Sequence, residues 1–190
     1  MGIEAFNLSS VSTPKKDTDR GERKEYVSAG AYRCKVTGIV TSDNINNYSG
    51  SPFVSFEVVT ETGKHGRCRF WAIKETDAPK TKEWKAKSLK DFLVNCGVSN
   101  FSTDSDAIKS ATGNWVNVVF TYEEYITKDK NTNEPKKGRM IRYRWSSKDG
   151  EEITYNPKYN KPLNPEDEAQ FKKLLDEYHG DSTSQEEDAF

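Results

Sequence analysis

Residues 52–73, PFVSFEVVTETGKHGRCRFWAI, contain two runs in which apolar and polar side chains alternate, separated by the polar turn Glu61–Lys64. A period of two residues is typical of β-strands with one buried and one exposed face. The side chains that this pattern places in the core are Val54, Phe56, Val58, Cys68, Phe70 and Ala72. Those that it places on the opposite face are Phe53, Ser55, Glu57, Arg67, Arg69 and Trp71. We therefore expect two adjacent strands, Pro52–Thr60 and Gly66–Ile73.

The segment before this pair adds a third strand, Ala31–Thr41, so that the three form a meander. Its side chains expected to face inward are Tyr32, Cys34, Val36, Gly38 and Val40. Those expected to face outward are Arg33, Lys35, Thr37 and Ile39. The loop Ser42–Ser51, rich in Asp, Asn, Ser and Gly, joins it to the next strand.

The segments after residue 73 predict a helix and two more strands. Apolar residues at helical spacing, followed by Gly97 as a stop, are Leu89, Phe92, Leu93 and Cys96. A short helical turn is possible at Ser105–Ala111, and strand periodicity returns in Asn114–Ile126 and Arg139–Ser146, joined by the loop Lys128–Gly138. In the fourth strand the residues expected outside are Trp115, Asn117, Thr121 and Glu123. The order of elements predicts a mainly β fold, a five-stranded OB-fold barrel with a helix between strands three and four.

The chain divides into a basic body and an acidic end. Its 29 Lys and Arg and 30 Asp and Glu give a net charge of −1, but residues 164–190 hold nine acids and two bases and carry −7, which leaves +6 on the first 163. A helical stripe of Phe171, Leu174, Leu175 and Tyr178 predicts an amphipathic helix over residues 164–179. Residues 1–27 and 180–190 are polar and rich in charge, so we expect a flexible arm and a disordered acidic tail around a domain of residues 28–163.

Composition and motifs argue against several classes of protein. No run of 18 apolar residues and no secretory signal pattern is present in the sequence, so we expect a cytoplasmic protein. The sequence has no nucleophile, phosphate-loop or metalloprotease motif, so we expect no enzyme. One candidate zinc-ligand set exists, formed by His65, Cys34, Cys68 and Cys96. Because the periodicity places each cysteine in the core, we interpret them as buried thiols and expect no metal or cofactor.

Basic and aromatic side chains gather on the exposed face of the predicted barrel and on its loops. Cations follow the phosphates of single-stranded nucleic acid, and aromatic rings stack on unpaired bases. The candidate contact residues are Arg33, Lys35, Tyr48, Phe53, Arg67, Arg69, Trp71, Lys128, Lys130, Lys136, Lys137, Arg139, Tyr143 and Trp145. Alternatively, such aromatic residues cover a barrel end and such lysines keep a sheet edge soluble. The lysines between Lys80 and Lys90 around Trp84 are typical of a solvated helix face, or extend the path of the strand.

The end of the chain, QEEDAF at residues 185–190, follows a basic body that contains SPFVSFEV, GRCRFWAI and LKDFLVNCG. In these features the chain resembles the single-stranded DNA-binding proteins of bacteriophages and bacteria. The resemblance implies a protein that coats transient single strands in phage DNA replication, recombination and repair, in the host cytoplasm. It also implies that the tail recruits a polymerase, primase-helicase or nuclease, through Glu186, Glu187, Asp188 and Phe190. The bacterial tail usually has Pro before the final Phe, whereas this chain has Ala189.

The negative charge of the tail predicts a second role for it. A tethered −7 segment competes with DNA phosphates for a +6 surface, although an acidic tail can also serve solubility alone.

The main alternative to a single-strand binder is a protein-interaction adaptor with an OB-like barrel whose basic face meets an acidic protein. A metal-dependent nuclease is a third hypothesis, but the chain lacks the carboxylate cluster that it needs. Strand annealing is a plausible additional activity of a single-strand binder.

Overall fold

The computed structural model of the protein describes residues 24–44 and 50–184. Contacts within this range divide it into two units. The first unit contains residues 24–120 and 142–155, and the second contains residues 121–141 and 156–184. Two long strands contribute residues to both units.

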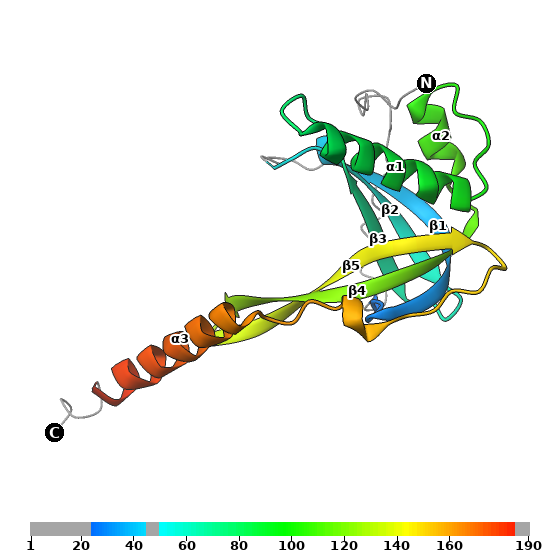
Figure 1. Ribbon diagram of the computed structural model, residues 1–190. Helices are drawn as coiled ribbons and strands as arrows, with labels where there is room; N and C mark the ends of the chain where they lie inside the picture. The colour runs from blue at the N-terminus through cyan, green and yellow to red at the C-terminus, as the bar shows by residue number, and fades with distance from the viewer. Residues whose placement is uncertain (1–23, 45–49, 185–190) are drawn as a thin grey trace. The chain divides into compact units, whose positions relative to one another are not determined.

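The five predicted strands are present and form one antiparallel sheet (Figure 1). They are β1 (Gly30–Thr41), β2 (Phe53–Thr60), β3 (His65–Trp71), β4 (Trp115–Lys128) and β5 (Pro135–Lys148). The helices are α1 (Pro79–Asn95), α2 (Asp104–Ser110) and α3 (Pro165–Ser184), with 3-10 turns at Ser42–Asn44 and Pro157–Tyr159. The mainly β class, with a helix between the third and fourth strands, is confirmed. The strands are hydrogen-bonded in the order β3-β2-β1-β4-β5, so pairing among the described residues leaves an open sheet and not a closed barrel.

Strand β1 contains a β-bulge that the alternation pattern did not predict. Val36 pairs with Val58, but Gly38 pairs with Glu57, so β1 holds one extra residue at this point. A bulge moves the side chains that follow it to the opposite face of the sheet. Ile39 is therefore buried, and the prediction that it faces outward is wrong.

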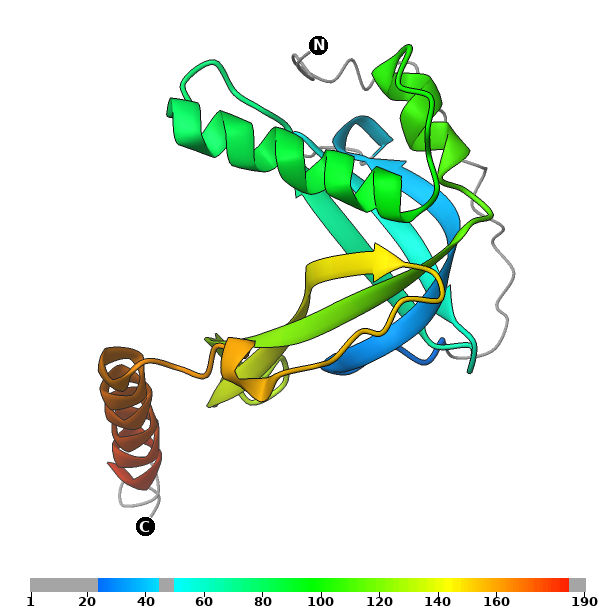
Figure 2. The same cartoon turned by 45° about the vertical axis from the view of Figure 1, so that its right-hand side comes forward.

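Helix α1 lies across one end of β1, β2 and β3, as both ribbon views show (Figures 1 and 2). Its buried stripe is the predicted one and consists of Leu89, Phe92 and Leu93. The centroid of the Phe92 ring lies 4.8 Å from that of Phe56 and 5.1 Å from that of Phe70. The helix ends at Asn95, and Gly97 follows with a φ of +79°, a left-handed conformation that glycine adopts without steric cost. This aromatic cluster is the centre of the core of the first unit.

The outer face of β4 is covered, contrary to the sequence prediction. Asn117 and Thr121 were expected to be exposed, and both are buried. In the first unit, the side-chain amide of Asn117 donates hydrogen bonds to the backbone carbonyls of Lys148 (2.9 Å) and Glu151 (2.7 Å). These bonds hold the chain that follows β5 against β4, which is why the polar side chain is inaccessible.

The second unit shows that the hairpin between β4 and β5 is longer than predicted. The predicted loop Lys128–Gly138 shrinks to a turn at residues 129–134, because β4 extends to Lys128 and β5 begins at Pro135. The hydroxyl of Tyr178 on α3 donates to the carbonyl of Thr132 in this turn, at 3.0 Å. The backbone of α3 is helical to Ser184, five residues beyond the helix that the sequence predicts. Residues 185–190 lie outside the described part.

Asp129 organises the hairpin turn. Its carboxylate accepts hydrogen bonds from Lys136 Nζ (2.9 Å) and from the backbone N–H groups of Asn131 (2.9 Å) and Thr132 (3.3 Å). These bonds, that of Lys136 above all, lower the pKa of Asp129 from its usual 3.8 to about 2. A carboxyl group whose pKa falls on folding stabilises the fold above its usual pKa, and this contribution is lost as the pH falls through the lowered value.

We therefore expect the turn to loosen only as the pH falls from 3.8 to about 2. In an NMR titration, the amide resonances of Asn131 and Thr132 are expected to move together in this window. The variant Asp129→Asn keeps the shape of the side chain without its charge and is expected to abolish the transition. A midpoint near 3.8 in the unmodified protein would contradict the prediction.

Candidate nucleic-acid interface

The strand register brings six predicted contact residues to one face of the sheet. Phe53 pairs with Trp71 across β2 and β3, and Arg69 lies opposite Ser55, two residues further along β2. Successive alternate residues of a strand lie on the same face, so Arg67, Arg69 and Trp71 share this face with Phe53. Arg33 and Lys35 of β1 lie on this face as well. Lys35 pairs with Val59, and Val59 and Ser55 lie on the same side of β2 because their positions differ by an even number. This part of the prediction is confirmed.

Arg69 is the centre of an aromatic group on this face. Its guanidinium carbon lies 4.3 Å from the ring centroid of Phe53 and 5.6 Å from that of Trp71. The two rings meet edge to face, with centroids 5.8 Å apart. Phe53 is only 1% exposed, so the prediction that it is an exposed stacking ring is wrong. Its ring packs against the exposed Arg69 and the half-buried Trp71.

The charge of Arg33 is neutralised within the first unit. Its guanidinium lies 4.5 Å from the ring centroid of Trp115 and forms a two-pronged ion pair with Asp149, at 2.6 and 2.9 Å. A third bond, of 2.6 Å, joins it to Glu61. The hydrogen bonds that Arg33 donates to Asp149 and then to Glu61 raise the pKa of Arg33, and the same bonds to Asp149 lower the pKa of its carboxyl group. Arg33 is thus a structural clamp more than a phosphate contact.

Trp115 belongs to this face although it was not among the predicted contact residues. It pairs with Lys35 across β1 and β4, and it is half-buried under Arg33. The polar alternation of β4 already placed it outward. Trp115 was therefore predicted to face outward beside the cations of β1, but it was not included among the predicted contact residues.

The remaining two cations differ in availability. Arg67 forms an ion pair with Glu57 on the neighbouring strand, at 3.1 Å, with both side chains largely in solvent. Exposed pairs of this kind contribute little energy, so phosphate can compete for Arg67. Lys35 is exposed, and no acid among residues 24–44 and 50–184 pairs with it. We call the exposed Lys35, Arg67 and Arg69 together with the half-buried Trp71 the aromatic-cation face.

The hairpin of the second unit is less available than the sequence suggested. Lys136 pairs with Asp129, Lys137 with Glu168 at 2.6 Å, and Arg139 with Glu124 at 2.9 Å. Lys137 also lies over the ring of Phe171 and Arg139 over that of Tyr122. Lys128 and Lys130 are exposed and form no ion pair with a described acid. Three of the five predicted hairpin cations are therefore used within the unit.

Two predicted residues on β5 lie away from the aromatic-cation face. Tyr143 packs in the core, with ring centroids 5.1 Å from Phe70 and 5.7 Å from Phe92, and burial raises its pKa well above the usual value. Tyr143 therefore lies on the inner side of β5, and its contact with nucleic acid stays a prediction. Trp145 is half-buried and lines a recess of about 260 Å³ with Ser88 and other residues of α1.

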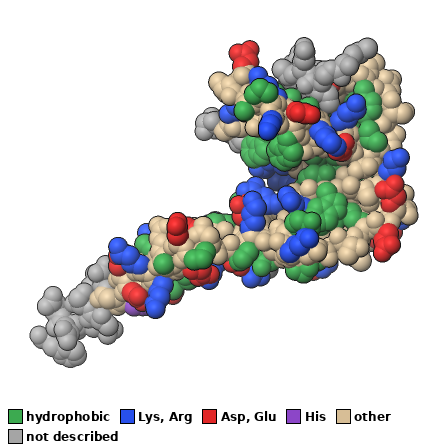
Figure 3. Space-filling view, viewed as in Figure 1, with side chains coloured by type: hydrophobic (Ala, Val, Ile, Leu, Met, Phe, Trp, Pro, Cys, Tyr) green, Lys and Arg blue, Asp and Glu red, His purple; other side chains and the backbone are tan. Residues whose placement is uncertain are grey.

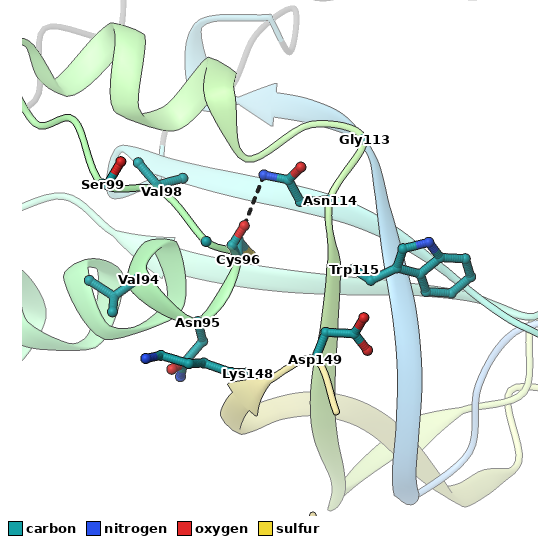
Figure 4. Close-up of a pocket in the computed structure, with 11 residues that line it drawn as sticks. Val94, Asn95, Cys96, Val98, Ser99, Gly113, Asn114, Trp115, Lys148 and Asp149 are labelled. Carbon is teal, nitrogen blue, oxygen red and sulfur yellow. Dashed lines mark hydrogen bonds between the residues drawn. The ribbon is translucent and has the colours of Figure 1, made fainter. Parts of the chain in front are cut away.

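A larger recess, of about 620 Å³, lies between the end of α1, the start of β4 and the end of β5 (Figure 4). Its amide side chains are already engaged in the chain's own structure. Asn114 Nδ2 donates to the carbonyl of Cys96 at 2.8 Å, and Asn95 Nδ2 donates to the carbonyl of Ser146 at 2.9 Å. The recess is thus a polar junction between elements, with no buried group that points to a ligand.

The three cysteines are buried free thiols, as the periodicity predicted. Burial raises the pKa of Cys34 and of Cys96 to about 12, and the pKa of Cys68 is raised as well. No group of three His, Cys, Asp or Glu side chains within the described part is arranged to hold a metal ion. Tyr48, Glu186, Glu187, Asp188 and Phe190 lie outside the described residues.

Comparison with known proteins adds no assignment. No protein family model matches the chain, and a search of curated proteins finds no match. Among the described residues, no helix is long and apolar enough to cross a membrane.

Proposed function

We propose that the chain is a single-stranded DNA-binding protein without enzyme activity, and that the aromatic-cation face is its primary contact surface. The observation that carries this proposal is Arg69 placed over Phe53 beside the accessible ring of Trp71. Stacking on unpaired bases requires an accessible ring, and holding the backbone requires cations a short distance away. Duplex DNA hides the faces of its bases, so this arrangement favours single strands.

We also propose that the five strands form an OB-fold barrel. Its support is the strand order β3-β2-β1-β4-β5 together with α1 between β3 and β4. The strands at the two ends of this order also touch through side chains, since the rings of Phe70 on β3 and Tyr143 on β5 lie 5.1 Å apart. In an OB-fold, the face of strands two and three binds oligonucleotides. Three of the four residues of the aromatic-cation face, Arg67, Arg69 and Trp71, lie on strand β3.

The biological setting that we propose follows from the resemblance to phage and bacterial single-strand binders. The chain coats transient single strands during phage DNA replication, recombination and repair. Its acidic end recruits replication proteins and competes with DNA for the basic body, a proposal supported by the division of charge into +6 and −7. Competition of this kind weakens with salt, as all exposed charge interactions do.

The alternative function, an OB-like adaptor that binds an acidic protein, uses the same cations for a different partner. Arg33 is already paired with two acids, and Arg67 with one, so the face is less basic than its sequence suggests. The adaptor hypothesis accounts for the remaining cations but gives no role to the accessible Trp71 ring beside Arg69. We therefore favour the single-strand binder.

Fluorescence anisotropy with labelled oligo-dT, the matching duplex and oligo-U tests the proposal over a salt series. We expect the tightest binding to oligo-dT, with log K falling against log salt at a slope of about −2, because three cations each release about 0.7 counterion. A chain that ends at residue 179 is expected to bind more tightly at low salt and equally at high salt. Absence of binding to all three probes at low salt would reject the proposal and favour the adaptor.

A further inference from the structure

Helix α1 carries an exposed tryptophan that the core does not use. Trp84 is 62% exposed, whereas the buried stripe of the helix lies on Leu89, Phe92 and Leu93. Residues three and four positions away share a helix face, which places Lys80 and Lys87 beside the Trp84 ring. A large aromatic ring that lies mostly in solvent contributes little to the core formed by the described residues.

The part of α1 that bears Trp84 is held rigidly. The ammonium of Lys85 donates to the carboxylate of Asp77 at 2.7 Å and to the carbonyl of Ala72 at 3.1 Å. Asp77 also accepts a hydrogen bond from the backbone of Lys74, at 2.8 Å. These bonds, that of Lys85 above all, lower the pKa of Asp77, so its carboxylate stays charged. Trp84 therefore projects from an anchored helix, so this part of the chain loses little conformational entropy when a ligand binds.

The same anchor joins α1 to the aromatic-cation face. Ala72, which accepts the bond from Lys85, is the residue that follows Trp71 in the chain. Residues 79–95 contain five lysines and two acids, a net charge of +3. Figure 3 shows lysine and arginine side chains beside hydrophobic ones on the part of the surface where Figure 1 draws α1. A polyanion that leaves Trp71 thus meets a second basic and aromatic surface of the same unit.

We propose that Trp84, Lys80 and Lys87 form a second contact region for single-stranded DNA, which extends the strand's path from the aromatic-cation face onto α1. This inference rests on the proposed function. The composition argues for nucleic acid over a protein partner, because lysine is depleted at the centres of protein interfaces. An exposed ring with flanking ammonium groups is instead the combination that binds a base and its neighbouring phosphates. Lys87 also pairs with Asp91 at 2.6 Å, an exposed pair that a phosphate can displace.

Two lengths of labelled oligo-dT separate the second region from the first. An oligonucleotide of about 6 nucleotides fills the sheet face alone, and one of about 20 nucleotides reaches α1 as well, given that OB-folds cover about 4–16 nucleotides. The variant Trp84→Ala is expected to bind the short probe as the unmodified protein does and the long probe at least about fivefold more weakly. Trp84→Phe keeps a stacking ring and is expected to restore most of the affinity.

A charge series refines the test. Lys80→Ala is expected to reduce the salt slope for the long probe by about 0.7 and to leave the slope for the short probe unchanged. The matched control is Lys109→Ala, which removes an exposed lysine of α2 and is expected to change neither slope. Because Trp84 lies outside the core, circular dichroism is expected to show an unchanged melting temperature for Trp84→Ala.

The outcomes distinguish this inference from the proposed function. If the unmodified protein binds neither probe, the proposed function fails, and the second region fails with it. If it binds both and Trp84→Ala binds both equally well, the second region is rejected and the proposed function stands. An equal loss for both probes likewise rejects the extension, because it places Trp84 within the primary contact.

Discussion

Replacing Trp71 by alanine is expected to weaken binding to oligo-dT by about 5- to 150-fold. The ring is the accessible aromatic surface of the aromatic-cation face, and stacking of one base on such a ring contributes about 1–3 kcal/mol. A loss of 1.4 kcal/mol corresponds to a tenfold change in the dissociation constant. Anisotropy at one fixed, moderate salt concentration measures the effect, since affinities at different salt concentrations are not comparable.

Variants of Arg69 separate its charge from its planar shape. Arg69→Lys keeps the positive charge but loses the flat guanidinium that lies 4.3 Å from the Phe53 ring centroid, so we expect weaker binding with an unchanged salt slope. Arg69→Ala is expected to lower the slope by about 0.7 as well. Trp71→Phe is the conservative control and should keep most of the affinity. Unchanged affinity in a folded Trp71→Ala protein would show that single strands bind elsewhere.

The variant Phe92→Ala is expected to reduce the free energy of unfolding by about 3–5 kcal/mol. Phe92 is fully buried, and its ring contacts those of Phe56, Phe70 and Tyr143. Removing it leaves a cavity that rigid aromatic neighbours fill poorly, so the cost includes lost packing as well as lost burial. Urea denaturation followed by circular dichroism measures the change in midpoint and slope.

Trp84 on the same helix is the matched control for this stability prediction. It is also a large aromatic residue, but at 62% exposure its replacement by alanine is expected to change the free energy of unfolding by less than about 0.5 kcal/mol. Phe92→Leu retains most of the apolar volume and should lie between the two. Similar losses for Phe92→Ala and Trp84→Ala would contradict the assignment of the core to the inner stripe of α1.

Local patterns in the sequence were sufficient to predict the elements of this fold. Period-two alternation in residues 52–73 places Val54 and Phe56 in the core, and helical spacing places Phe92 there. Both patterns depend only on backbone geometry, which repeats every two residues in a strand and every 3.6 in a helix. The bulge in β1 and the burial of Asn117 under the end of β5 depend on neighbouring strands and segments. Neither can be predicted from the local pattern of apolar and polar residues.

The candidate site shows the same division. The sequence by itself indicated that Arg67, Arg69 and Trp71 share one face of the sheet, because alternate residues of a strand without a bulge lie on the same side. Only the tertiary structure decided which cations on that face are available. Arg33 pairs with Glu61, 28 positions away, and with Asp149, 116 positions away. Ion pairs between residues so distant in the chain form only when folding brings these segments together, and they mark Arg33 as a structural arginine.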